Sequence, residues 1–103
     1  MGSNKRYADR LDRQYAQRTD EIIMRDSKPD TLKTAELELD KYAMTIPPSP
    51  IPVMAWVRYG NIPLRVEGEA VRWTEKVVAV QWDTPGGQHK AWLWASAVDR
   101  REP

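Results

Sequence analysis

The sequence predicts an α+β fold in which an N-terminal helix and a second, shorter helix pack on a C-terminal five-stranded β-barrel. Before a proline-rich stretch at 46–52 the apolar residues recur at helical spacing. After that stretch they alternate with period two and are rich in valine and tryptophan. A chain of 103 residues suits one small domain. These observations divide it into a helical extension at 1–45, a linker at 46–52 and a barrel at 53–103.

The N-terminal helix is predicted from apolar side chains at steps of four residues or nearly two turns, namely Tyr7, Leu11, Tyr15 and Ile22. The stretch DSKPD at 26–30 ends this helix, because Pro29 disfavours the helical conformation at the residue before it. A second helix is predicted in TAELELDKYAM at 34–44, with Thr34 as its N-cap.

The linker IPPSPIP at 46–52 contains four prolines, which remove amide donors and restrict the backbone. It predicts an extended connector between the two parts of the chain. Pro47 and Pro50 also have the P-x-x-P spacing that docks into aromatic grooves of other proteins. A plain spacer between packed parts is the simpler interpretation.

Five strands are predicted after the linker, at 53–60, 63–74, 76–83, 89–95 and 99–102. Gly86 and Gly87 permit a left-handed turn between the third and fourth strands. In the second strand the alternation of apolar residues changes phase around Gly68, which predicts a bulge or a bend at a barrel corner. ASAV at 95–98 predicts a single 3₁₀ turn before the short last strand.

This arrangement of short strands, bent second strand, glycine hairpin and 3₁₀ turn resembles the SH3-like small barrels. The motif AWLWASAVDR at 91–100 falls where such barrels carry a tryptophan-bearing fourth strand that runs into the turn. The resemblance covers residues 53–101 and implies the fold alone. The whole chain, with its Arg/Asp-rich helix, is also similar in style to short proteins of actinobacteria and their phages.

Composition excludes several classes of function. Sixteen basic and fifteen acidic residues give a net charge of +1, which is not the strong positive field of a general nucleic-acid binder. The chain has no cysteine, and a lone histidine, His89, cannot build a histidine-based metal site. No stretch approaches the roughly 20 apolar residues of a membrane span. We expect a protein without cofactor or membrane association, in the bacterial cytoplasm or in a virion.

The tryptophans allow two interpretations. In the fourth predicted strand Lys90, Trp92 and Trp94 share one face, while small and aliphatic residues occupy the other. Such a ladder is either a stacking platform for bases or peptide side chains, or a surface covered by the N-terminal helix. Five tryptophans cannot all fit inside so small a barrel, and the helix has an apolar stripe that needs a partner. Covering by the helix is therefore favoured, and the platform stays open.

No catalytic arrangement is visible. Asp83 is predicted near His89 across a hairpin, but no serine or cysteine nucleophile has a place beside them. We expect a non-enzymatic module that binds a protein partner, as an adaptor or assembly component, with its oligomeric state left open. Nucleic-acid binding through basic and tryptophan-bearing strand faces is the alternative. The candidate contact residues are Trp56, Arg58, Tyr59, Arg72, Trp73, Lys90, Trp92 and Trp94.

Overall fold

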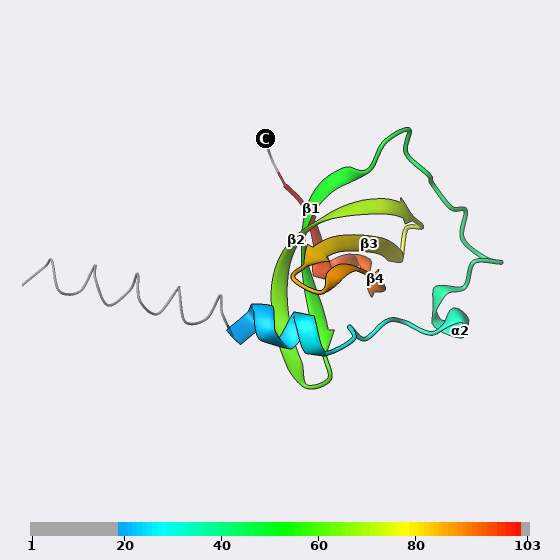
Figure 1. The fold of residues 1–103 in the computed structure, drawn as a ribbon. Coiled ribbons are helices and arrows are strands. Elements are labelled where there is room, and N and C mark those ends of the chain that lie inside the picture. Colours follow the sequence, from blue (N-terminus) through cyan, green and yellow to red (C-terminus); the bar gives the residue numbers. More distant parts are fainter. Residues whose placement is uncertain (1–18, 102–103) are drawn as a thin grey trace, which may run out of the picture.

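The computed structural model describes residues 19–101. The elements in chain order are a helical segment at 19–26, α2 (Thr34–Leu37), β1 (Ile51–Tyr59), β2 (Ile62–Trp73), β3 (Val77–Thr84), β4 (Gly87–Trp94), the 3₁₀ turn η1 (Ala95–Ala97) and β5 (Val98–Arg100). The strands form one antiparallel sheet that curls strongly, with the helical segment beside its lower end (Figure 1). The predicted α+β class is confirmed.

The sheet has the order β4-β3-β2-β1-β5. Each of the first four strands pairs with the next one along the chain, and β5 returns to the outer side of β1, where Val53 faces Arg100. All five predicted strands overlap observed ones, and η1 lies within the predicted 3₁₀ turn. The main difference is at the start of β1, which begins at Ile51, within the segment expected to be a linker.

Burial along the strands follows the alternation in the sequence. On β1 every second residue from Val53 to Tyr59 is buried, and on β2 the same pattern runs from Leu64 to Ala70. The register against β3 then shifts between Ala70 and Arg72. The predicted phase change in the second strand is therefore present, but it lies beyond Gly68.

Gly68 has a different role, because it allows β2 and β3 to approach closely. A Cβ atom on Gly68 would lie only 2.6 Å from the backbone carbonyl oxygen of Gln81. Glycine is the one residue that fits such a contact without a shift of the backbone.

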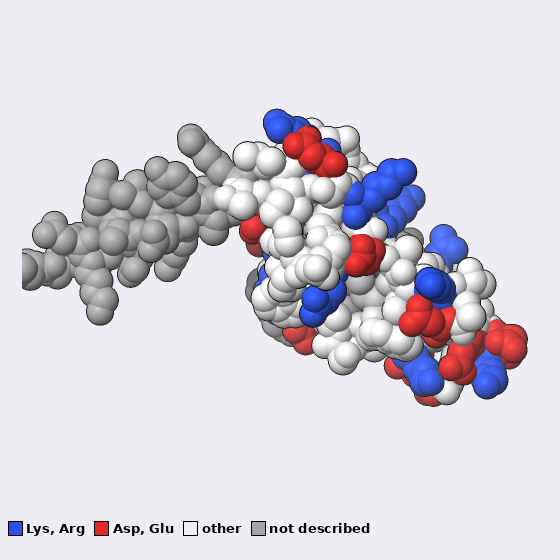
Figure 2. Space-filling model, turned by 90° about the horizontal axis from the view of Figure 1, so that it is seen from below, with Lys and Arg blue, Asp and Glu red and all other residues white. Residues whose placement is uncertain are grey.

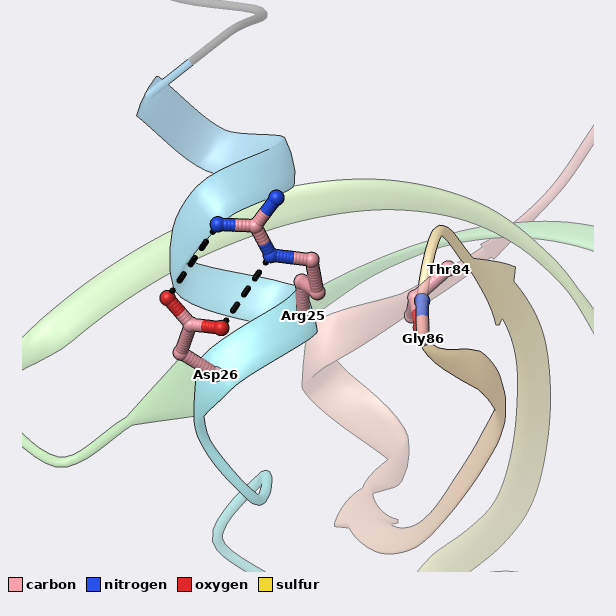
Figure 3. Close-up of polar contacts among 4 residues, drawn as sticks. All are labelled: Arg25, Asp26, Thr84 and Gly86. Carbon is pink, nitrogen blue, oxygen red and sulfur yellow. Dashed lines mark hydrogen bonds and ion pairs between the residues drawn. The ribbon is translucent and has the colours of Figure 1, made fainter.

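The helical segment at 19–26 packs at the turn between β3 and β4. A Cβ on Gly86 would lie 3.2 Å from the backbone oxygen of Arg25, and Figure 3 shows Gly86 beside this residue. Ile23 and Met24 pack against the hydrophobic core. The Arg25 guanidinium pairs with the neighbouring Asp26 carboxylate at 3.1 Å (Figure 3). The remainder of the predicted N-terminal helix lies outside the described residues.

α2 is much shorter than the helix predicted at 34–44. It ends because Glu38 adopts a left-handed conformation with φ of 49°. The N-cap is Lys33 and not Thr34, and the Glu36 carboxylate accepts a hydrogen bond from the Lys33 backbone N–H at 2.9 Å. The buried side chain of Leu37 fixes this single turn to the rest of the molecule.

Candidate functional site

A groove of about 430 Å³ lies between β1 and β4, two strands that do not pair with each other. Its walls are mostly apolar and aromatic. The lining residues are Asp30, Thr31, Leu32, Trp56, Val57, Arg58, Pro63, Trp92, Leu93, Trp94 and Ala97. Four of the eight predicted contact residues are among them.

One wall is the extended segment 30–32, here named the strap, which bridges β4 and β1. The Asp30 N–H donates to the Arg58 carbonyl at 2.7 Å, and the Leu32 N–H donates to the Trp92 carbonyl at 3.0 Å. The Trp92 N–H in turn donates to Thr31 Oγ1 at 2.8 Å. The outer backbone groups of an edge strand are open to pairing with any chain. The strap pairs with the outer N–H and carbonyl of Trp92 and thereby joins the two sides of the groove.

Two half-exposed indoles border the groove. Trp56 on β1 is 48% exposed and Trp94 on β4 is 44% exposed. Ala91 and Leu93 are buried, so the predicted alternation along β4 is confirmed, with Trp92 and Trp94 on the outer face. Aromatic surface left half open beside a concave wall is characteristic of a binding site.

The cover over this face differs from the one expected. The strap contacts Trp92, whereas the described part of the N-terminal helix packs at the β3–β4 turn. Residues 19–26 of the predicted helix do not line this face, and the part of the helix that carries Tyr7, Leu11 and Tyr15 lies outside the described residues. An extended segment makes the contact because its backbone can pair with the free edge of β4, which a helix cannot do.

Trp56 is held in place by a cation. The guanidinium carbon of Arg65 lies 5.5 Å from the centroid of the Trp56 ring, and the two residues are opposite each other in the β1–β2 register. Arg65 also approaches the Asp99 carboxylate at 3.5 Å. A cation over an exposed indole contributes about 0.5–1 kcal/mol, so this contact helps to fix the rim of the groove.

The structure places Tyr59 in the core and not on the binding face. Its hydroxyl accepts a hydrogen bond from Trp82 Nε1 at 3.1 Å and lies 2.8 Å from His89 Nδ1. Burial raises the pKa of Tyr59 above its ordinary value. His89 packs beside Tyr59 and the edge of Trp82, while Asp83 faces Gln88 across the hairpin. The half-buried His89 therefore forms a polar cluster with the buried Tyr59 and Trp82.

Trp73 also lies away from the groove. Its backbone N–H and carbonyl pair with Thr45 at 3.0 and 2.7 Å, and its ring packs against the core. Arg72 and Lys90 are exposed and line a separate, smaller hollow together with Trp92. The predicted set thus divides into groove residues (Trp56, Arg58, Trp92, Trp94), two cations beside Trp92, and two residues elsewhere.

Sequence reasoning missed the strap and the contribution of Pro63 to the lining of the groove. The residues from Pro29 to Lys33 show no period that would assign them to a surface. The strap could have been predicted only indirectly, because an exposed edge strand that carries tryptophans requires some other segment to cover it.

The charges around the site are mixed. Figure 2 shows one face of the molecule, on which Lys and Arg are interspersed with Asp and Glu and separated by uncharged surface. Among residues 19–101 no group of His, Asp or Glu has the arrangement of a metal site. In that same part of the chain, none of the helices has the length and apolar character needed to cross a membrane.

Comparison with protein-family models finds no family that matches the chain, and searches of curated proteins and of solved structures find no match either. The case for a function therefore depends on the groove and its neighbours.

Proposed function

We propose that this protein is a non-enzymatic binding module that holds an extended segment of a protein partner in the groove. The observation that carries the proposal is the pair of half-exposed indoles, Trp56 and Trp94, at the border of a concave apolar surface. Tryptophan is the residue most enriched among the anchors of protein interfaces. The volume of about 430 Å³ is within the range of sites that enclose a short peptide or small ligand.

The polar groups of the groove also favour a neutral segment. Asp30 and Arg58 contribute one charge of each sign, so the groove has no field that would select a polyanion. An adaptor or assembly component needs this kind of surface, because its partner is recognised by shape and apolar contact.

We further propose that the curled sheet is an SH3-like small barrel. The order β4-β3-β2-β1-β5 and the position of η1 directly before β5 support this assignment. The strap then closes the seam between β1 and β4.

Nucleic-acid binding is the second candidate, and one observation favours it. Arg72 and Lys90 line the smaller hollow together with Trp92, and cations beside an indole suit phosphate contact with base stacking. Against it, Glu69 lies near on the same sheet and contacts Gln81 at 3.4 Å. The protein-binding groove is the larger and more apolar of the two surfaces, so we place it first.

A peptide selection on the full chain tests the proposal. Peptides selected from a random library are titrated against the wild type, Trp56→Ala, Trp94→Ala and the control Arg72→Glu, with folding checked by circular dichroism. Loss of an interface anchor costs about 2 kcal/mol or more, so each tryptophan variant should bind about 30-fold more weakly or worse. Arg72→Glu should bind as the wild type does.

A nucleic-acid titration gives the result that would contradict the groove proposal. Labelled DNA and RNA are titrated at two salt concentrations. If no peptide is selected, while nucleic acid binds with an affinity that falls steeply with salt and drops in Arg72→Glu, the groove proposal is wrong and the second candidate replaces it.

A further inference from the structure

A second uncovered apolar feature lies in the same chain, in the proline-rich segment 46–50. Ile46 is 68% exposed, the most exposed of the large apolar side chains in residues 19–101. Pro48 and Pro50 in this segment are exposed as well. The segment carries no charge and, through its prolines, few amide donors. It is an uncharged and largely exposed loop that bends at Pro48 and Ser49, and only Pro47 is half-buried.

The segment is held open at both ends. Thr45 is fixed by two backbone hydrogen bonds to Trp73, and Ile51 begins β1 opposite Ala70. Figure 1 shows the chain between α2 and β1 as an arc that stands away from the sheet. Prolines restrict its backbone further. A loop whose backbone is already restricted loses little conformational freedom when it binds, which favours its use as a ligand.

We propose that the groove of one copy of this chain binds segment 46–50 of a second copy. This inference rests on the proposed function, since it names the partner of the same groove. Ile46 and the neighbouring prolines would lie against Trp56 and Trp94, an aromatic surface of the kind that receives proline-rich segments. Joining the two surfaces buries the most exposed apolar side chain and both half-exposed indoles of the groove in one contact.

Within one copy, segment 46–50 is not among the residues that line the groove. Ile51 is five residues before Trp56 on the same strand, a separation of about 16 Å at roughly 3.3 Å per residue. The other anchor, Thr45 against Trp73, lies at that same end of the sheet, because Ala70 faces Ile51 across the β1–β2 pair.

Sedimentation of the full chain over micromolar to millimolar concentrations tests the inference. We expect reversible association that Ile46→Asp and Trp94→Ala each weaken by about 30-fold or more. Ile22→Asp is the matched control, because Ile22 is also an exposed isoleucine and lies in neither surface. Mixing Ile46→Asp with Trp94→Ala should restore a mixed dimer, since one variant keeps an intact groove and the other an intact segment.

A chain that stays monomeric over this range, or association that Ile46→Asp leaves unchanged, overturns the inference. Ile46→Asp decides the matter even if Trp94→Ala fails to fold, because Ile46 lies in an exposed loop. A synthetic peptide of residues 44–53 separates the two proposals. If it fails to displace a library-selected peptide from the groove, the second-copy partner is wrong and the proposed function stands. If neither peptide binds, both proposals fail.

Discussion

Gly68→Ala should destabilise the protein by forcing two paired strands apart. The new Cβ would lie 2.6 Å from the carbonyl oxygen of Gln81, 3.1 Å from Val80 Cγ1 and 3.3 Å from Trp82 Cβ. Ordinary contacts of carbon atoms begin near roughly 3.5 Å, so the strands must separate by about 0.5–1 Å. The nearest atom belongs to backbone and cannot rotate away.

The expected loss follows from two opposing effects. Overpacking in a well-packed site costs about 1–3 kcal/mol. Alanine also restricts the unfolded chain, which stabilises by about 0.4–1 kcal/mol. The net loss in the free energy of unfolding is therefore about 1–2 kcal/mol. At about 4–8 °C per kcal/mol for a domain of this size, Tm should fall by about 4–16 °C. Thermal unfolding followed by circular dichroism measures this shift.

Gly60 provides the control. It has φ of +65° with no atom within 4 Å of the position that a Cβ would take. Glycine is favoured there because the backbone is left-handed, and not because a side chain would lack room. Asparagine tolerates that conformation, and Gly60→Asn should change Tm little. Gly68→Asn should be at least as harmful as Gly68→Ala. A Gly68→Ala variant that melts at or above the wild-type temperature would refute the close approach of β2 and β3.

Three further predictions concern the strap, the core and the rim. Thr31→Val removes the acceptor for the Trp92 N–H and should lower the free energy of unfolding, measured in urea, by about 0.5–1.5 kcal/mol. Thr31→Ser keeps the hydroxyl acceptor and should not lower it. Equal losses in both variants would contradict the hydrogen bond. Burial raises the pKa of Tyr59, so the neutral phenol is favoured in the folded state. The stabilisation that follows from this pKa difference is complete below the ordinary pKa of 10.0 and is lost as pH rises through the pKa of the folded state. The wild type should therefore lose more stability at alkaline pH than Tyr59→Phe. Parallel stability profiles of the two proteins would contradict this. Arg65→Gln removes the cation over Trp56 and should lower the free energy of unfolding by at most about 1 kcal/mol. The same variant should change the indole NMR signal of Trp56. An unchanged signal would contradict the contact.

The strands were predictable because their signals are local. Apolar residues, among them many valines and tryptophans, recur at every second position in these segments. That period specifies both the strand and its buried face. The early start of β1 was not predictable from the same signal. Its prolines favoured a linker, yet the first residues of a strand tolerate proline, and pairing of Ile51 with Ala70 extends the sheet.

The candidate site was only partly predictable. Period two alone separates Trp56 and Arg58 from Tyr59, because residues an odd number of positions apart on a strand face opposite sides. The inclusion of Tyr59 among the contact residues overlooked this rule, and the structure shows the side chain buried. The strap is different, since its contact with Trp92 joins residues 61 positions apart. No local pattern reports such a contact.

That separation also bears on the order in which the molecule folds. The hairpins β1–β2 and β3–β4 join neighbours in the chain, whereas the strap must close a long loop before it gains its hydrogen bonds with Trp92. The strap should therefore dock late, and until then β4 presents an unprotected edge that carries Trp92 and Trp94. Such edges recruit strands from other molecules. A newly made chain is accordingly most prone to aggregate in the interval between sheet formation and strap docking, and variants such as Thr31→Val should lengthen that interval.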